Sequence, residues 1–494
     1  MADDDARVAA RFSTTIAIIL VLSAVGLTYE IAAGRVLAPF FGTSLLTWTT
    51  VIAVVLAGFS LGSALGGLIA EKPHDDARRD VRNALVASAV LMALSPLFLG
   101  VLTSMGARGT GGMIFSVIVV FFPASVCITL PSPYLAKLAI AVRPGREGSS
   151  LGYVLAAGSV GAIFGAILAG FVTLPLIGST ATFAACGLVA LACLPFLRGG
   201  LGDAKATKDA RSDTVISIAA LGLVGVAGMA GAPVCQFESG LSCLHVAERD
   251  GTVRLYSDGT TQAAERLQRA DEDTLALSYT QWLWDRLETD LGPASAVLFI
   301  GGGGYTLPTQ LLEARPEARA VAVEIDPLVT EVVRAHLPRA AAMIRQTGYE
   351  GAQAPDEARL HLVHADGRVF LNETTMRFDA VVMDAFSSGS VPAHLATIET
   401  YARLRDIVSG PVYVNLIGQP DGSLVRGVHA ILIALYPHVI AIEGPVGASG
   451  RANTLLAAGP VAFAPLDRLP DGYRPVTISP GRAFTDDRGW VGHR

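Results

Sequence analysis

The sequence predicts a polytopic bundle of about seven transmembrane α-helices, followed by an α/β domain with a doubly wound, mainly parallel sheet. Two observations support this fold class. Hydrophobic residues make up 51% of the 494 residues and charged residues only 16%, and the composition changes sharply near residue 235. Before that point apolar runs alternate with short charged connectors, whereas beyond it charged and apolar residues mix as in a water-soluble enzyme. We therefore place a membrane domain at residues 1–234 and a second domain at residues 235–494.

Seven runs in the first domain carry at most one charge each. Each is about 20 residues long, which is the length that an α-helix needs to cross ~30 Å of hydrocarbon. The first lacks a small-residue cleavage site and continues past Glu30, so we interpret it as a span and not as a removed signal peptide. The seventh is rich in glycine and alanine, so a re-entrant segment and a count of six remain alternatives. The runs cover roughly residues 14–33, 47–70, 84–105, 113–136, 151–177, 180–197 and 214–234.

Positive charges gather in alternate connectors of this domain. Arg7 and Arg11 precede the first run, and the connectors after the second, fourth and sixth runs hold three or four Lys and Arg residues each. The other connectors hold chiefly Arg35 and Arg108. Cytoplasmic connectors of membrane proteins are enriched in Lys and Arg, so we expect the N-terminus in the cytoplasm. A seventh span would place the second domain on the opposite side, whereas a re-entrant seventh run would leave it inside.

Three polar or small-residue patterns stand out near the spans. Glu30 lies within an apolar run, where a carboxylate usually faces a partner or a cavity, and Arg35 is the nearest candidate partner. Glycines at every fourth position of the second run, residues 58, 62 and 66, favour close helix packing. Cys235 and Cys243 follow the last run; on an oxidising face they could form a disulfide, and in a reducing compartment they would be free thiols.

The second domain begins with short strands and continues with a repeated strand and helix pattern. Residues 242–248 and 252–256 flank Arg249-Asp250-Gly251, which is typical of a hairpin turn, and we divide the domain into a hairpin and helix element, 235–290, and a sheet region, 291–494. Alternating strands and helices predict a Rossmann-like sheet whose ligands lie at the carboxyl ends of the strands. We expect one helix at 271–291, a second that follows the glycines at 301–304 and ends at 314, and a third at 328–337. We expect strands at 296–300, 320–325, 361–365, 378–383, 411–417, 438–443 and 454–458.

Glycines and acids follow the ends of the predicted strands. Gly301 to Gly304 separate a strand from a helix, which lets the backbone approach a ligand and presents helix N–H groups to it. Glu324 ends the next strand, where a carboxylate can accept hydrogen bonds from both ribose hydroxyls. Asp366 and Asp384 end the following two strands. Thr306 replaces the third glycine of the dinucleotide fingerprint, so an adenosyl sulfonium fits this pattern better than NAD.

These residues also have structural interpretations. The glycine loop and Asp366-Gly367 could be tight turns, and Asp326 before Pro327 is expected to cap a helix. Asp384 is the strongest functional candidate, because it ends an apolar strand and opens a Ser/Gly-rich loop, residues 385–391, which we expect to cover a site.

The order of these motifs resembles that of spermidine synthase and related polyamine aminopropyltransferases over residues 238–440. The first domain, with Tyr29-Glu30, resembles that of bacterial membrane-fused spermidine synthase-like proteins, which implies a multi-pass protein of a bacterial-type inner membrane. The motifs are Glu238-Ser239, Asp258-Gly259 with Gln262, Gly301-Gly302-Gly303, Glu324-Ile325-Asp326, Asp366-Gly367 and Asp384.

The resemblance implies a class I methyltransferase-like fold and a site, without a metal, for decarboxylated S-adenosylmethionine or S-adenosylmethionine as co-substrate. Gln262 would lie near its methionine-derived part, the loop with Gly301 and Gly303 would adjoin it, Glu324 would bind the ribose, and Asp366 with Gly367 would lie by the adenine. Asp384 would be the catalytic aspartate, which accepts a proton from the attacking amine or orients that amine.

Departures from the family concern the amine side. The family's glycine loop carries an aspartate where this chain has Gly304 followed by Tyr305, and its Tyr-His-Glu stretch appears as Tyr279-Thr280-Gln281. The second acid of its catalytic loop falls on Ser387. Each lost charge-assisted contact would weaken the binding of a dicationic acceptor by on the order of a few kcal/mol. The acceptor therefore need not be putrescine.

We therefore expect a transferase that moves a group from (decarboxylated) S-adenosylmethionine to an amine, as in polyamine biosynthesis. A methyltransferase or a sulfonium lyase with the same co-substrate is one alternative. A transporter or sensor with a ligand-binding, enzyme-like domain is another. The expected partners are a small amine and the lipid bilayer, with no nucleic acid, and homo-oligomer formation is left open.

Overall fold

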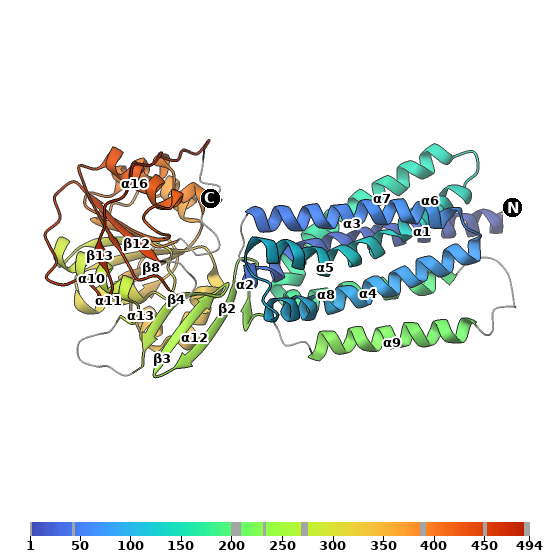
Figure 1. The fold of residues 1–494 in the computed structure, drawn as a ribbon, viewed down its shortest axis with the longest axis horizontal. Coiled ribbons are helices and arrows are strands. Elements are labelled where there is room, and N and C mark those ends of the chain that lie inside the picture. The colour runs from blue at the N-terminus through green and yellow to red at the C-terminus, as the bar shows by residue number, and fades with distance from the viewer. Residues whose placement is uncertain are drawn as a thin grey trace. The chain divides into compact units, whose positions relative to one another are not determined.

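The computed structural model describes residues 2–41, 45–198, 209–230, 234–267, 275–385, 392–447 and 452–488. The chain divides into two compact units, Met1–Gly240 and Leu241–Arg494, which Figure 1 draws in blue to green and in green to red. The described part of the first unit consists of helices, the short connections between them and β1 (Phe237–Glu238). Its helices are α1 (Ala2–Val36), α2 (Ala38–Phe41), α3 (Leu45–Glu71), α4 (His74–Ser104), α5 (Gly109–Thr129), α6 (Pro131–Ala141), α7 (Glu147–Leu168), the π-helical turn Ala169–Thr173, α8 (Leu174–Ala192), the 3-10 turn Leu194–Arg198 and α9 (Asp209–Ala230).

Five helical stretches of the described chain are long and apolar enough to cross a membrane. The last of them contains the predicted fifth and sixth runs in one stretch of 51 residues, and the predicted seventh run is a shorter apolar helix, Val215–Met229. Length and composition therefore support membrane spans but give fewer separate stretches than the seven runs. The five are Val8–Phe41, Leu46–Glu71, His74–Ser104, Gly109–Ala141 and Glu147–Leu197.

The fifth stretch contains a break at Gly178, whose backbone is not helical (φ 73°, ψ 174°). Before the break, Gly161 of α7 lies against Leu20 of α1, and one turn further along both helices Gly165 lies against Ala24. Helices α7 and α1 therefore run in the same direction.

After the break the direction is opposite. Tyr29 of α1 packs edge-on against Phe183 of α8, with ring centroids 5.3 Å apart. One turn earlier in α1, the carbonyl of Val25 faces the thiol of Cys186, which lies almost one turn later in α8. Helix α8 is thus antiparallel to α1, and the chain reverses between α7 and α8 (Figure 1).

Glycines provide the close helix contacts that their spacing predicts. A Cβ at Gly62 of α3 would overlap Thr129 of α5, and one at Gly58 would lie 2.6 Å from the Cβ of Ser125. A side chain at either position would therefore push α3 away from α5.

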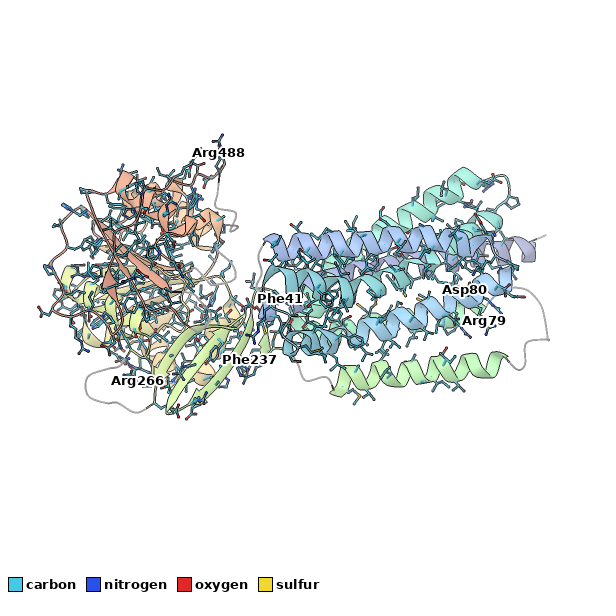
Figure 2. All side chains as sticks on the ribbon, viewed as in Figure 1. Phe41, Arg79, Asp80, Phe237, Arg266 and Arg488 are labelled. Atoms are coloured by element: carbon cyan, nitrogen blue, oxygen red, sulfur yellow. The ribbon has the colours of Figure 1, made fainter. Side chains whose placement is uncertain are left out.

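Phe41 and Asp80 lie at opposite ends of this helical unit (Figure 2).

The second unit starts with an antiparallel sheet of β2 (Cys243–Arg249), β3 (Thr252–Ser257) and β4 (Thr260–Arg266). Asp250 and Gly251 both have positive φ, 53° and 67°, as a two-residue hairpin turn requires, so the predicted hairpin is confirmed. Asp258 and Gly259 form a second such turn, with φ of 47° and 75°. The strand that follows this second turn, β4, is not among the predicted strands.

A nine-stranded sheet forms the rest of the unit, in the order β13-β11-β12-β10-β9-β5-β6-β8-β7. The neighbours from β10 to β7 are parallel, whereas β12 pairs antiparallel with both β10 and β11. The strands are β5 (Ala296–Ile300), β6 (Arg319–Glu324), β7 (Gly348–Tyr349), β8 (Leu360–His364), β9 (Ala380–Met383), β10 (Val412–Ile417), β11 (His438–Glu443), β12 (Asn453–Gly459) and β13 (Arg474–Pro475).

Helices cover this sheet, and their bounds differ in places from those expected. Helix α10 begins at Ser278, later than predicted, because Leu275 pairs with Glu265 in a β-bridge and Leu277 is extended. The central strands are buried almost throughout, as the apolar runs of a parallel sheet predict. The helices are α10 (Ser278–Asp290), α11 (Thr306–Ala314), α12 (Pro327–His336), α13 (Pro338–Thr347), α14 (Gly367–Glu373), the 3-10 turn Ala393–Leu395, α15 (Ile398–Ile407) and α16 (Ser423–Leu435).

Candidate active site

The glycine loop brings the ends of two neighbouring strands together. Gly301 follows β5 with a φ of 96°, and a Cβ added there would lie 2.5 Å from the backbone carbonyl oxygen of Asp384 at the end of β9. Positive φ and lack of space both require glycine at this position. The loop therefore places its backbone directly beside the predicted catalytic aspartate.

Glu324 is held by two backbone N–H groups at the end of β6. Its Oε2 accepts a hydrogen bond from the Gly303 amide at 3.0 Å, and its Oε1 accepts one from the Asp326 amide at 3.1 Å. Burial raises the pKa of Glu324, and the hydrogen bonds from Asp326 and Gly303 oppose that rise. Each carboxylate oxygen has two lone pairs, so both can still accept from ligand hydroxyls.

Asp384 lies between two hydrogen-bond donors. The Tyr279 hydroxyl of α10 donates to Oδ2 at 3.1 Å, and the Asn415 side-chain amide of β10 donates to Oδ1 at 2.7 Å. Burial raises the pKa of Asp384 from 3.8 to about 6, and the two hydrogen bonds hold it lower than burial alone would. Burial and the neighbouring Asp384 raise the pKa of Tyr279 well above its usual value. At neutral pH this arrangement is a carboxylate next to a neutral phenol.

The structure brings Tyr279, which was predicted only as a residue of the amine side, into contact with Asp384, and it adds Asn415, which was not predicted. Asn415 is a buried amide within the otherwise apolar or aromatic strand Val412–Ile417. A polar residue near the carboxyl end of such a strand was the available sign of a site residue.

Tyr305 supports the glycine loop from within the core. It is fully buried and has a φ of 55°, which is unusual for a residue other than glycine. Its hydroxyl lies 2.6 Å from Oγ1 of Thr330, which in turn lies 2.9 Å from Nε2 of His364. The ring also lies beneath Gly302, where a Cβ would be 3.0 Å away. Its contacts are therefore with α12, β8 and the loop itself.

The neighbouring Gly304 has no room for a side chain. A Cβ at this position would overlap the Cβ of Ala263 in β4 and would lie 3.2 Å from Leu337. The carbonyl oxygen of Gln262 is 3.8 Å from the position of a Cβ on Gly303. Strand β4 thus lies along the glycine loop, and its backbone at Gln262 adjoins that loop.

Asp366 and Asp326 both cap helices. Oδ1 of Asp366 accepts from the amides of Arg368 and Val369 at the start of α14, and its Oδ2 lies 2.9 Å from Nε2 of His394. Asp326 accepts from the Leu328 amide at the start of α12, as predicted. The carboxylate at 366 therefore has a structural role in addition to the adenine contact that the resemblance implies.

Two further predicted positions complete this region. A Cβ on Gly367 would lie 2.7 Å from the Ile300 side chain, so close packing requires glycine after Asp366. Ser387 and most of the predicted cover at 385–391 lie outside the described residues.

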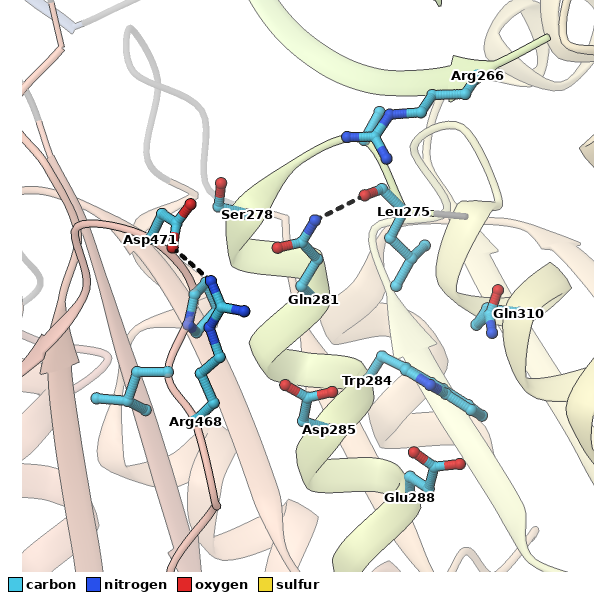
Figure 3. Close-up of a pocket in the computed structure, with 13 residues that line it drawn as sticks. Arg266, Leu275, Ser278, Gln281, Trp284, Asp285, Glu288, Gln310, Arg468 and Asp471 are labelled. Atoms are coloured by element: carbon cyan, nitrogen blue, oxygen red, sulfur yellow. Dashed lines mark hydrogen bonds and ion pairs between the residues drawn. The ribbon is translucent and has the colours of Figure 1, made fainter. Parts of the chain in front are cut away.

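A polar cavity of about 510 Å³ lies on the other face of α10 (Figure 3). Ser278, Gln281, Asp285 and Glu288 line it from this helix, and Gln281 donates to the Leu275 carbonyl at 2.9 Å. Gln281 therefore faces this cavity, whereas Tyr279 contacts Asp384. Among the described residues, no group of three or more His, Cys, Asp or Glu side chains could hold a metal ion.

The membrane candidates lie in the helical unit. Nε of Arg35 is 3.8 Å from Oε1 of Glu238, whose Oε2 accepts from the amide and the hydroxyl of Ser179. The ion pair that the structure gives for Arg35 is thus with Glu238 of the first motif, and not with the expected Glu30. Glu30 is 8% exposed, and its Oε2 has no hydrogen-bond partner within the described chain.

Comparisons with known proteins agree with the resemblance. The family model described as "Spermine/spermidine synthase domain" matches residues 287–415. The polyamine aminopropyltransferase of Ruegeria sp. is 35% identical over 94 residues, which are 19% of this chain and 30% of that protein. The corresponding protein of Saccharolobus solfataricus is 32% identical over 120 residues, 24% of this chain and 36% of that protein. The chain spans about a third of the length of these curated relatives.

Solved structures that the comparison matched include a probable spermidine synthase from Corynebacterium glutamicum, with a TM-score of 0.41 and 16% identity over 50% of this chain and 93% of that one. A spermidine synthase from Thermotoga maritima has a TM-score of 0.35 and 19% identity over 45% of this chain and 70% of that one.

The matched range contains the glycine loop, Glu324, Asp366 and Asp384. The second unit is therefore spermidine synthase-like over residues 287–415, and the resemblance inferred from the motifs is confirmed for this range.

Proposed function

We propose that this chain is a membrane-bound aminopropyltransferase-like enzyme that transfers the aminopropyl group of decarboxylated S-adenosylmethionine to an amine. The observation that carries the proposal is the position of Asp384, which is hydrogen-bonded to Tyr279 and directly beside the Gly301 backbone. The acceptor's nitrogen forms a bond to carbon as the carbon–sulfur bond breaks, and sulfur keeps that electron pair. The proton that the nitrogen loses goes to Asp384.

The residues of the chain have separate tasks in this reaction. Glu324 and the amide of Gly303 form a preorganised ribose site, and the positive-φ glycines allow the ligand to approach the backbone. Asp384 is mostly a carboxylate above pH 6, so it can accept a proton from an ammonium group and leave a lone pair on nitrogen. Tyr279 holds this carboxylate in place.

The same nucleotide residues also fit methyl transfer or sulfonium cleavage, in which S-adenosylmethionine is the co-substrate. A transport or sensing role has one observation in its favour, the buried Oε2 of Glu30 without a described partner. Membrane proteins seldom place an unpaired carboxylate in an apolar helix unless it binds a cation or a proton.

Mass spectrometry of reactions with the purified full chain tests the proposal. The chain is incubated with decarboxylated S-adenosylmethionine or S-adenosylmethionine and a panel of monoamines and diamines. We expect methylthioadenosine together with an aminopropylated amine. Methylthioadenosine alone would indicate cleavage, S-adenosylhomocysteine would indicate methylation, and binding without turnover would favour sensing.

Asp384→Asn provides the matched control for that experiment. The amide keeps the size of the side chain and removes the proton acceptor, so turnover should be lost while methylthioadenosine still binds. Turnover at the original rate would exclude Asp384 from the mechanism.

We also propose that residues 1–234 form a multi-pass membrane domain with a cytoplasmic N-terminus in a bacterial-type inner membrane. Residues 235–494 would then form a catalytic domain outside the cytoplasm. The charged connectors support this orientation. So does the packing of α9: Gly187 of α8 lies against Val224, and Ala184 lies against Gly228, so α9 is antiparallel to α8.

A further inference from the structure

Two asparagine side chains extend the contacts of Asp384 into the sheet. Asn453, the first residue of β12, donates from Nδ2 to Oδ1 of Asn415 at 2.8 Å. Asn415 donates in turn from Nδ2 to Oδ1 of Asp384 at 2.7 Å. Strands β10 and β12 are antiparallel neighbours, so the amides come from adjacent strands. Asn415 is only 3% exposed.

The direction of this chain of hydrogen bonds follows from chemistry. An ionised carboxylate can only accept, so Asn415 must turn its NH₂ group toward Asp384. Its carbonyl oxygen then faces Asn453, which must also present an NH₂ group. The two amides therefore have one consistent orientation for as long as Oδ1 of Asp384 carries no proton.

The other carboxylate oxygen has a more permissive partner. Oδ2 of Asp384 faces the hydroxyl of Tyr279 at 3.1 Å, and a hydroxyl can either donate or accept. A proton on Oδ2 would keep a favourable contact because the hydroxyl can rotate. A proton on Oδ1 would point at the N–H of Asn415 and would leave a buried donor without an acceptor.

We propose that Asn415 and Asn453 are positioning residues that keep Oδ1 of Asp384 as a hydrogen-bond acceptor and thereby reserve Oδ2 for the proton of the attacking amine. In the step itself the N–H bond breaks, the proton moves to Oδ2, and nitrogen keeps the electron pair with which it attacks carbon. The identity of the proton donor rests on the proposed function, whereas the preference for Oδ2 depends only on the contacts of Asp384.

The groups around Asp384 come from several elements. Helix α10 contributes Tyr279, and Tyr473 just before β13 interacts with that phenol. Strands β10 and β12 contribute the two neutral amides. The backbone of Gly301, which follows β5, lies beside the backbone of Asp384. The described influences on the pKa of Asp384 are burial, which raises it, and the hydrogen bonds from Asn415 and Tyr279, which lower it.

Infrared titration of the full-length protein tests the inference without requiring turnover. The C=O band of a protonated carboxyl group is followed against pH, and the band missing in Asp384→Asn is assigned to Asp384. Asn415→Leu removes the donor to Oδ1, so the midpoint should rise by about one pH unit or more. In the same variant kcat should fall about tenfold or more while KM for the nucleotide stays unchanged.

Asn453→Asp is the sharper variant, since a carboxylate at 453 can only accept. Asn415 must then turn its NH₂ group toward position 453 and its carbonyl oxygen toward Oδ1 of Asp384, so the midpoint of Asp384 should again rise. Thr454→Val is the matched control, because Thr454 follows Asn453 on β12 and its hydroxyl donates a 2.7 Å hydrogen bond to the carbonyl of Gly418. The loss of that bond should leave the midpoint of Asp384 unchanged.

Unchanged midpoints in folded Asn415→Leu and Asn453→Asp would overturn the inference. An equal shift of the midpoint in Thr454→Val would also overturn the inference, because a general loosening of the sheet would then explain the shift without any role for the two amides. Shifted midpoints in a protein that forms no aminopropylated product would uphold the positioning role and contradict only the proposed reaction.

Discussion

The amide of Gly303 donates to Oε2 of Glu324 at 3.0 Å, so the glycine loop after one strand holds the carboxylate that ends the next strand. The Asp326 amide holds the other oxygen. A carboxylate fixed in this way needs no reorganisation when hydroxyl groups of a ligand arrive. Preorganisation of this kind favours affinity because little conformational entropy is lost on binding.

Glu324→Ala should therefore weaken nucleotide binding strongly. Two charge-assisted hydrogen bonds are lost, and about 2–3 kcal/mol corresponds to roughly 30- to 150-fold in Kd. Calorimetry with methylthioadenosine measures the change. Glu350→Ala is the control, because Glu350 is an exposed partner of Arg334, and this variant should bind methylthioadenosine with the affinity of the wild type. If the wild type and both variants bind with equal affinity, Glu324 is not part of the site.

The rate should increase with pH through about 6, because Asp384 must lose its proton before it can accept one. The pH dependence of kcat/KM measures this ionisation in the free enzyme. A profile that stays flat between pH 5 and 8 would contradict the assignment.

The same ionisation predicts an effect on stability. The pKa of Asp384 is higher in the folded chain than its usual 3.8, so the folded state binds the proton more tightly, and the stability from this group decreases as pH rises from about 4 to 6. Asp384→Asn should therefore have a higher Tm than the wild type at pH 7 and a smaller advantage at pH 4. Thermal melts at both pH values measure the difference, and a lower Tm at pH 7 would contradict it.

Gly301→Ala should unfold or displace the site. The added methyl group would lie 2.5 Å from the Asp384 carbonyl oxygen, in addition to the strain of φ 96°. Gly351→Ala separates the two effects, since its φ is 99° but no atom lies within 4 Å of the new Cβ. We expect a loss of about 1–2 kcal/mol for Gly351→Ala, and a clearly larger drop in Tm for Gly301→Ala. Equal melting temperatures would show that the loop can move aside.

Gly62→Leu should destabilise the helical unit in detergent, because a side chain there overlaps Thr129 of α5. Gly67→Leu lies on the same helix α3 with no atom within 4 Å of its Cβ, and should fold normally. Thermal unfolding monitored by gel filtration compares the two. If both variants melt like the wild type, the packing of α3 against α5 does not determine stability.

Cys235 and Cys243 are disulfide-bonded in the structure, and the proposed position of the second domain outside the cytoplasm would preserve this bond, because disulfides persist in oxidising compartments. A membrane-impermeant maleimide should therefore label these two cysteines in intact cells only after reduction. Cys235→Ser/Cys243→Ser should lose that labelling. Labelling of neither cysteine in intact cells but of both after lysis would place the second domain in the cytoplasm.

The sequence predicted the features that local residue patterns determine. Asp250-Gly251 specified a hairpin turn through positive φ, and Asp326-Pro327 specified a helix start. Long-range contacts were harder. Asn415 stood out only as a polar residue in an apolar strand, and its role could not be predicted because it depends on a carboxylate 31 positions away. Helix α10 starts late because Leu275 pairs with Glu265 of β4, a tertiary contact that helix propensity does not reveal.

The contact between Gly304 and Ala263 makes the residue types at these two positions, which are distant in the sequence, depend on each other. A mutation that adds any side chain at 304 meets the methyl group of Ala263 and lies within 3.2 Å of Leu337, so it would be harmful in this chain, and Ala263→Gly should relieve only the closer of the two contacts. This packing contact therefore couples two positions that are far apart in the sequence, since a side chain at 304 requires a residue smaller than alanine at 263.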